Sequence, residues 1–171
     1  MSVSKQDENL LLEQQKELNR IAKEYDECYR SLSRLYGIPE GQLWTLYEMR
    51  LRGGEMAQSD LVNVTFMPKQ TVNSSIKKME ALGLIVLSQA GNGRRKTVTL
   101  TESGEALARK TADRVIGAEA SSLCKMSETE RKDLLRLFGK YISELQRSVD
   151  DEERKGISQE GSLTDDAEEC P

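Results

Sequence analysis

Six polar or basic residues recur along one short stretch of the chain, and their types are those that contact nucleic acid. They are Lys69, Gln70, Thr71, Asn73, Ser74 and Lys77. Ammonium and hydroxyl groups bind phosphate oxygens, and the amides of Asn and Gln can bond both polar positions on the edge of adenine. The solvated face of an amphipathic helix carries the same residue types, so this stretch alone leaves both interpretations open.

A second basic group, Arg94, Arg95 and Lys96, follows the turn sequence GNG at residues 91–93. Glycine and asparagine tolerate the positive φ that a tight hairpin turn requires. The flanking runs are rich in β-branched residues, which indicates two short strands. The sequence therefore predicts a cationic hairpin suited to reaching a DNA minor groove, although a plain charged turn has the same composition.

The residue patterns by which most enzymes are recognised are absent. The chain has no histidine, which excludes Ser-His triads, acid–base chemistry by imidazole and nearly all zinc sites except those made of thiolates. The three cysteines, Cys28, Cys124 and Cys170, stand far apart without a CxxC pair, which favours a reducing cytoplasm. We therefore expect no enzyme activity, no cofactor and no metal. No secretory signal or membrane-spanning run is evident, so a cytoplasmic location is predicted.

Charge is distributed unevenly along the chain, which has a net charge of −4. Residues 68–110 hold eight basic and three acidic residues, a net charge of +5. Residues 150–171 hold two basic and nine acidic residues, a net charge of −7. Because the local field matters more for phosphate binding than the total, the middle of the chain is predicted to face nucleic acid. The acidic end is predicted to be a disordered tail.

Hydrophobic periodicity predicts the elements that position these residues. Apolar residues at spacings of three and four predict a long helix over residues 11–36, ended by Gly37 and Pro39. A single helix of this length cannot bury its own apolar seam, so it must pack on another element or on a second subunit. The following segments are predicted to be helices over 40–52, 58–64 and 68–82 and strands over 84–87 and 97–100.

Two further helices complete the chain. Thr101 is a predicted N-cap for a helix that continues through Ile116, and the capping box SETE at residues 127–130 begins the last helix. One side of that last helix is apolar, with Leu134, Phe138, Tyr141, Leu145 and Val149. The order short helix, turn, helix and β-hairpin in the middle of the chain is the winged helix-turn-helix plan. The predicted fold is thus mainly α with a small β-hairpin wing.

Three motifs resemble the MarR family of transcriptional regulators. Residues 56–61, MAQSDL, are similar to the family's LTQSEL, and residues 71–85 contain TV and MEALGLI, similar to its TV…LEEKGLI. Residues 92–104 contain NGR and VTLTESG, similar to its DxR…VxLTxxG. The three motifs occur in the family's order and spacing without gaps. In coarser form the resemblance extends over the helices from about Leu10 to Val149.

The resemblance implies a homodimer whose long terminal helices intertwine and whose two winged lobes bind a pseudo-palindromic operator in double-stranded DNA. It also implies a small aromatic or anionic effector that releases the DNA, which is the behaviour of a repressor. Arg94 would be the wing-tip residue in the minor groove. The reading edge of the recognition helix would include Lys69, Gln70, Thr71, Asn73 and Ser74.

Four residues depart from the family pattern. Asn92 replaces the wing aspartate that helps to hold the arginine, and Ser74 replaces an arginine of the recognition helix. Pro68 replaces a capping serine, and Phe66 replaces a glycine of the turn. These departures are compatible with the fold, but they leave the operator sequence unspecified.

The chain is accordingly divided into four parts. Residues 1–37 are predicted to be an N-terminal dimerisation helix and 38–104 a winged helix-turn-helix DNA-binding lobe. Residues 105–149 are predicted to be C-terminal dimerisation helices and 150–171 the acidic disordered tail.

Two alternative functions stay open. Cys28 could sense redox state on the same scaffold, although its place on or beside the apolar seam favours a buried structural thiol. Alternatively, the lobe could bind protein and never DNA, an interpretation that the net acidity supports and the local charge of +5 opposes. Thiol titration with and without denaturant tests the first alternative, and retention on heparin tests the second.

Overall fold

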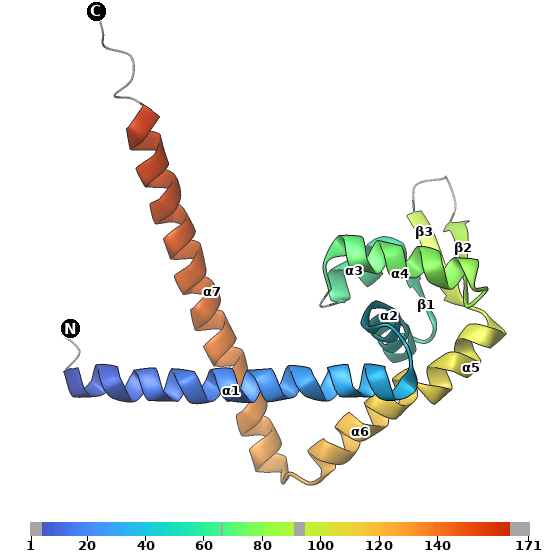
Figure 1. Ribbon diagram of the computed structural model, residues 1–171, viewed down its shortest axis with the longest axis horizontal. Coiled ribbons are helices and arrows are strands. Elements are labelled where there is room, and N and C mark those ends of the chain that lie inside the picture. The colour runs from blue at the N-terminus through green and yellow to red at the C-terminus, as the bar shows by residue number, and fades with distance from the viewer. Residues whose placement is uncertain (1–4, 66, 91–94, 165–171) are drawn as a thin grey trace, which may run out of the picture. The chain divides into compact units, whose positions relative to one another are not determined.

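The computed structural model describes residues 5–65, 67–90 and 95–164, and the side chains of these except residues 90, 95 and 156–164. The chain forms two compact units, one from Met1 to Glu119 and one from Ala120 to Pro171. The elements in chain order (Figure 1) are α1 (Lys5–Tyr36), α2 (Glu40–Leu51), β1 (Glu55–Ala57), α3 (Gln58–Val64), α4 (Lys69–Ala81), β2 (Ile85–Ala90), β3 (Arg95–Leu100), α5 (Glu102–Lys110), α6 (Ala112–Cys124) and α7 (Glu128–Thr164).

The end of α1 follows from the residues that terminate it. Gly37 has a φ of +62°, which only glycine adopts without strain, and the N–H of Ile38 donates to the carbonyl of Ser33 over 3.2 Å. Pro39 then precedes the first turn of α2. The predicted stop of the long helix at Gly37 and Pro39 is confirmed.

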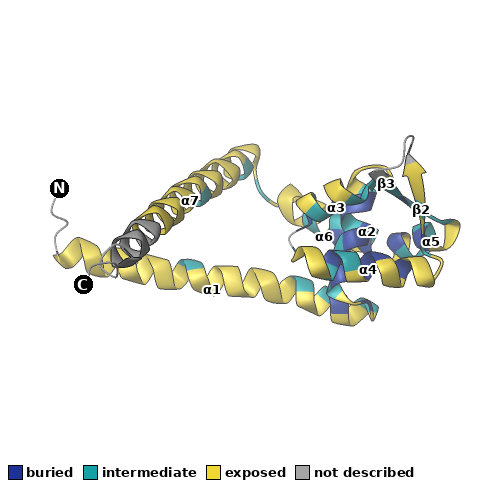
Figure 2. Ribbon diagram, turned by 90° about the horizontal axis from the view of Figure 1, so that it is seen from above, coloured by how far each residue is buried: buried dark blue, intermediate teal, exposed yellow. Residues whose placement is uncertain are grey.

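The core of the first unit lies among α2, α3, α4 and the sheet. Its largest fully buried apolar side chains are Leu43, Leu46, Met49, Leu61, Val72, Ile76, Met79, Val98 and Val115. Figure 2 shows this burial concentrated in the lobe, whereas most of α1 is exposed. The inward faces expected for the second, third and fourth helices are confirmed for most of their residues, although Trp44 and Tyr47 are only half-buried. Leu82, expected on the inward face of the fourth helix, is exposed, so its placement was wrong.

The sheet has three antiparallel strands in the order β1-β3-β2. Its hairpin agrees with the predicted wing, and both strands are longer than predicted because the ladder continues to the pair Ala90 and Arg95. The turn at residues 91–93 lies outside the described residues. Strand β1, in which Met56 pairs with Val98, was missed by the sequence analysis. Three residues are too few to show the alternation by which a strand is recognised.

The helix predicted from Thr101 through Ile116 is in fact two helices, so that prediction was wrong. The backbone of Thr111, with φ −125° and ψ −79°, leaves the helical region between α5 and α6. The hydroxyl of Thr111 donates to the carbonyl of Leu107 over 2.8 Å, and the apolar spacing continues across the break. The periodicity therefore concealed the change of direction. The cap itself is confirmed, because Thr101 Oγ1 accepts from the N–H of Gly104 over 3.1 Å.

The second unit is dominated by α7, which begins at the predicted capping box. The N–H of Ser127 donates to Glu130 over 2.7 Å, and the N–H of Glu130 donates to the Ser127 hydroxyl over 3.2 Å. The helix continues to Thr164. The prediction of a disordered tail over residues 150–171 was therefore wrong for residues 150–164. Ion pairs three residues apart, such as Lys155 with Glu152 over 2.7 Å, support helix in this acidic segment.

Within the described residues, the helices all lack the length of apolar sequence that crossing a bilayer requires.

Candidate nucleic-acid interface

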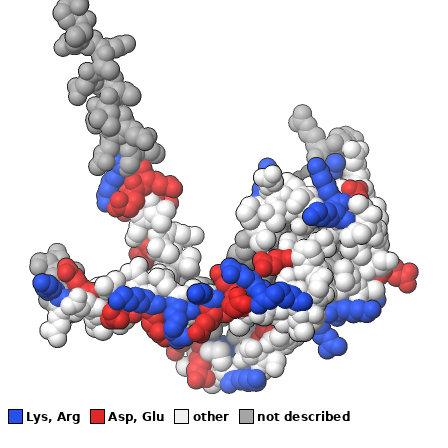
Figure 3. Space-filling model, viewed as in Figure 1, with Lys and Arg blue, Asp and Glu red and all other residues white. Residues whose placement is uncertain are grey.

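Helix α4 has one face in the core and one in solvent. Val72, Ile76 and Met79 are fully buried at spacings of four and three, which fixes the rotation of the helix about its axis. Five of the six residues predicted on this helix lie on its other face and line a single shallow hollow: Lys69, Gln70, Asn73, Ser74 and Lys77. Figure 3 shows basic side chains on the surface of the lobe. The arrangement offers ammonium groups to phosphates and amides to base edges.

Thr71 lies at the edge of this face, toward α2. It is half-buried, and a Cβ added at Gly41 would lie 3.2 Å from its methyl group and 2.4 Å from Ser75 Oγ. The two helices therefore approach closely because position 41 lacks a side chain. The backbone carbonyl of Thr71 accepts from the Ser74 hydroxyl over 2.9 Å. Thr71 thus contributes to the packing of α4 on α2 and stands apart from the hollow.

Gln58, the first residue of α3, reaches the same face of α4 and was not among the predicted site residues. Its Nε2 donates to Oδ1 of Asn73 over 3.0 Å, and both side chains are half-buried. The sequence places Gln58 in a family-like motif, but nothing in that motif indicates which side chain of the next helix it meets. The contact depends on the crossing of α3 and α4, which local sequence does not encode.

The wing is described in part. Lys96 is exposed on β3, opposite Gln89 of β2, and Arg95 is the strand's first residue, opposite Ala90. The placement of Lys96 is compatible with the predicted contact to DNA. Arg94, the predicted wing-tip residue, lies outside the described residues.

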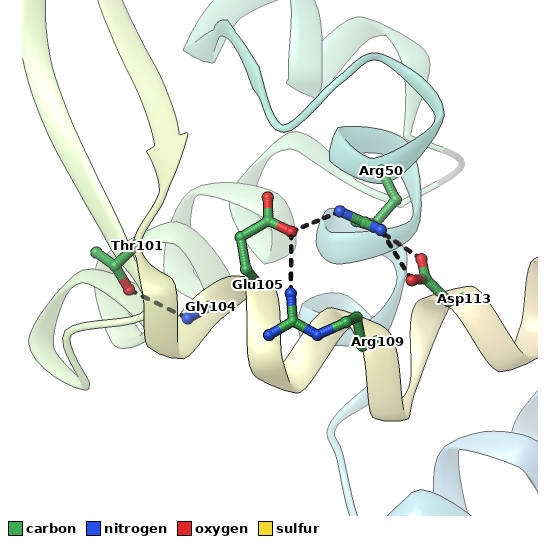
Figure 4. A network of polar contacts seen from close by, with 6 residues as sticks. All are labelled: Arg50, Thr101, Gly104, Glu105, Arg109 and Asp113. Carbon is green, nitrogen blue, oxygen red and sulfur yellow. Dashed lines mark hydrogen bonds and ion pairs between the residues drawn. The ribbon is translucent and has the colours of Figure 1, made fainter.

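A network of ionic contacts ties the lobe together behind the wing (Figure 4). Arg50 of α2 holds both oxygens of Asp113 through Nε and Nη2, each over 2.8 Å, and contacts Glu105 through Nη1 over 2.5 Å. Arg109 lies 3.9 Å from the same Glu105 carboxylate. The hydrogen bonds that Arg50 donates to Asp113 raise the pKa of the Arg50 guanidinium, and this effect exceeds the lowering caused by burial. The network fixes α5 and α6 relative to α2 and so supports the base of the wing.

Thr101 connects the base of the wing to the end of α4. Its hydroxyl donates to the carbonyl of Gly83, at the end of α4, over 2.7 Å, and its backbone N–H donates to the carbonyl of Leu84 over 3.0 Å. One residue thus holds the exit of α4, the end of β3 and the start of α5 together.

An aromatic cluster joins α1, α2 and α6 within the first unit. The hydroxyls of Tyr29 and Tyr47 donate to the two carboxylate oxygens of Glu119 over 2.6 and 2.7 Å. Trp44 lies between the two tyrosines, with ring centroids 4.9 and 5.2 Å away, and Tyr25 lies against Tyr29. Burial, followed by the hydrogen bonds to Glu119, raises the pKa of both phenols well above the ordinary tyrosine value.

Cys28 is exposed on α1 in this single chain, so the expectation of a buried thiol was wrong for the chain by itself. It lines a hollow together with Glu24, Glu27, Ser31, Leu32 and Leu35. The apolar seam of α1 is correctly placed, but no described residue of the chain covers it at this point. Among the side chains described, no group of three or more acidic residues or cysteines is arranged to hold a metal ion.

The comparisons with known proteins point to one family. Residues 36–96 match the MarR family. The fold is similar to that of AbsC, a MarR family transcriptional regulator from Streptomyces coelicolor, with a TM-score of 0.62 and 18% sequence identity. That similarity covers 85% of this chain and 98% of AbsC. No curated protein sequence matches the chain.

Two further solved structures are similar to this chain. MepR from S. aureus, in a complex with DNA, has a TM-score of 0.58 and 22% identity, covering 75% of this chain and 94% of MepR. BpsR from Bordetella bronchiseptica, whose DNA binding is regulated by 6-hydroxynicotinic acid, has a TM-score of 0.55 and 21% identity, covering 73% of this chain and 98% of BpsR.

Identities at this level show a shared fold, and the family match adds the sequence evidence. It spans the helix-turn-helix and the hairpin as far as residue 96, which includes the motif of the recognition helix and the first part of the wing motif. Those segments form the winged lobe described above, with α4 packed on α2 and the hairpin beside it. Residues 36–96 therefore match the MarR family, and the similar solved structures show that the chain shares their fold.

Proposed function

We propose that the protein is a sequence-specific DNA-binding transcriptional regulator that binds a pseudo-palindromic operator as a homodimer. The observation that carries the proposal is the outward face of α4, where lysines and amides line one hollow and no acidic residue is among them. A helix with this face fits a B-DNA major groove, which is about 12 Å wide. The similar fold of MepR, captured in a complex with DNA, supports the assignment. The family is one of regulators, in line with the expectation that the chain is not an enzyme.

Dimerisation is supported by apolar side chains that each unit leaves exposed. On α1 these are Leu10, Leu11, Leu12, Ile21, Tyr25 and Leu35. On α7 they are Leu134, Leu135, Leu137, Phe138, Tyr141, Leu145 and Val149. Patches of this extent on a soluble protein mark surfaces that another chain covers. The proposed dimerisation helices are those of residues 1–37 and 105–149, and the DNA-binding lobe is residues 38–104.

The proposal includes repression relieved by a small aromatic or anionic effector. BpsR, of similar fold, has its DNA binding regulated by 6-hydroxynicotinic acid, an aromatic acid. The aromatic cluster of Tyr29, Trp44 and Tyr47 joins α1 to the lobe, so a ligand that disturbed it would alter the base of α2. A redox role for Cys28 is the second candidate, favoured by the exposure of that thiol.

Selection of bound sequences from a random duplex pool tests the proposal. We expect the full chain to enrich one sequence with two inverted halves about one helical turn apart, roughly 34–36 Å. On the selected duplex, the dissociation constant should rise steeply with salt because phosphates release counterions. A folded protein that enriches no sequence, and that flows through heparin at low salt, would instead be a protein-binding winged helix.

A further inference from the structure

The contact between Gln58 and Asn73 bears on what the recognition helix reads. The donor is the amide nitrogen of Gln58 and the acceptor is the amide oxygen of Asn73, 3.0 Å apart. Asn73 lies among the residues that line the hollow of α4, so its side chain stands where a base edge would lie. The directions of its amide oxygen and amide nitrogen therefore decide which hydrogen bonds Asn73 can make with DNA.

The backbone of Gln58 is held in place by its neighbours, so its side chain can orient the amide of Asn73. It follows Ala57, whose backbone is paired with Thr97 in the sheet, and it opens α3, whose Leu61 is fully buried. Its own side chain is half-buried against α4. Strand and helix fix the backbone on both sides of Gln58, and the hydrogen bond to Asn73 gives its amide a defined direction.

An asparagine reads adenine with both ends of its amide. Its nitrogen donates to N7, and its oxygen accepts from the amino group at position 6. In this protein Oδ1 of Asn73 accepts a hydrogen bond from Gln58 with one of its two lone pairs, so the oxygen is turned toward α3. The amide nitrogen, which only donates, is then the end turned away from α3. Guanine presents two acceptors in the major groove, N7 and O6, and no donor. An amide that presents its donor end to DNA therefore matches guanine better than adenine.

We propose that Gln58 is a positioning residue for sequence specificity, which turns Asn73 into a hydrogen-bond donor and so selects guanine over adenine at one base pair of each half-site. The proposal rests on the proposed function, since it assumes that α4 enters the major groove. It refines the sequence-based expectation that Asn73 contacts base edges by specifying the chemistry of the edge.

The test compares the base preferences of five full-length proteins, the wild type and four variants, selected on the same random duplex pool. Asn73→Ala identifies the base pair in question, because the preference there should be lost. The wild type should prefer guanine at that position. Gln58→Ala frees the oxygen of Asn73, so the ratio of guanine to adenine should fall by about five- to tenfold, the low end of what one good base contact provides. Ser59→Ala, next in sequence and exposed, is the control and should leave the ratio unchanged.

Gln58→Glu tests the direction of the contact. A carboxylate cannot donate to Asn73, but it accepts from the amide nitrogen and would turn the oxygen outward. The preference should then move toward bases with an amino group in the major groove, adenine or cytosine. Equal thermal unfolding temperatures for all variants would show that the changes in preference are not due to loss of folding.

Two results separate the inference from the proposed function. If the wild type selects an operator and the guanine preference survives both substitutions at Gln58, the positioning role is wrong and the DNA-binding role stands. The same holds if the position lost in Asn73→Ala is an adenine in the wild type. If the folded wild type enriches no sequence at all, the proposed function fails and the inference fails with it.

Discussion

Among the described glycines of the lobe, Gly104 leaves the least room for a side chain, although it lies in an ordinary helical turn of α5. A Cβ at this position would lie 1.9 Å from the carbonyl oxygen of Leu84. That oxygen already accepts a hydrogen bond from the N–H of Thr101, so it cannot withdraw without breaking the connection between the end of β3 and the exit of α4. The close approach explains in physical terms why the motif VTLTESG ends in glycine.

We expect Gly104→Ala to lower the free energy of unfolding by about 1 to 3 kcal/mol, the usual range for overpacking. Urea unfolding at one fixed protein concentration measures the change. Ser103→Ala is the matched control, because Ser103 is exposed in the same turn and alanine favours helix. Unchanged stability in Gly104→Ala would show that α5 can move away from Leu84.

Tyr29 and Tyr47 give the protein a stability that depends on pH in the alkaline range. Burial and the hydrogen bonds to Glu119 raise the pKa of both phenols above the ordinary tyrosine value of about 10. The folded state therefore holds these protons more tightly than the unfolded state. Their contribution is fully present below the unfolded pKa and is lost as pH rises from about 10 toward the folded pKa values.

We expect the free energy of unfolding to fall above about pH 10, and to fall less steeply when both tyrosines are replaced by phenylalanine, since those phenols then no longer titrate. The double variant should also be less stable at neutral pH, because the Glu119 carboxylate loses two donors. Chemical denaturation at a series of pH values measures both effects. Parallel pH profiles for the two proteins would show that the cluster does not titrate with folding.

At the scale of elements, most of what the sequence predicts concerns single helices, and most of what it misses depends on how elements meet. The ends of α1 and α4 are predictable because Gly37 and Gly83 act on the backbone locally, with φ values of +62° and +67°. Strand β1 and the break at Thr111 depend instead on pairing and packing with distant segments. The hydrogen bond of Gln58 to Asn73 belongs to the same class.

The helical segment after residue 149 is a case in which composition alone gave the wrong structure. Residues 150–171 carry a net charge of −7, and α7 continues into them as far as Thr164. An acidic segment on the same chain can compete with DNA phosphates for the basic residues of the lobe. The competition should be strongest at low salt, where charges act over a longer range.

We therefore expect truncation after Val149 to tighten binding to random-sequence duplex, and to do so more at 0.05 M salt than at roughly 0.2 M, since the Debye length shortens with salt. Affinity for the selected operator should rise less, because base contacts are unaffected. Fluorescence anisotropy with labelled duplex measures both. Identical affinities for the truncated and full chains at low salt would assign the acidic segment a solubilising role only.

At the scale of the whole molecule, the second unit has little that one chain can bury. Phe138, Tyr141 and Leu145 of α7 are 57%, 41% and 45% exposed, and their spacing places them on one side of the helix. Each large apolar side chain gains about 1.5 to 3 kcal/mol when it is removed from water. A seam of several such residues is therefore sufficient to hold two chains together. A charged side chain placed in this seam would be buried in the dimer without a partner of opposite charge.

We expect the wild type to have twice the chain mass by light scattering at low micromolar concentration, and Phe138→Glu to shift it toward a single chain. Ser143→Glu is the matched control, because it adds the same charge to the opposite side of α7, where Ser143 is exposed. Loss of the dimer should also weaken operator binding by at least about a hundredfold, since two linked lobes gain roughly 10²–10⁴ in avidity over one. A wild type that is monomeric and still binds its operator would contradict the proposed dimer, and a Phe138→Glu protein that stays dimeric would move the interface away from this seam.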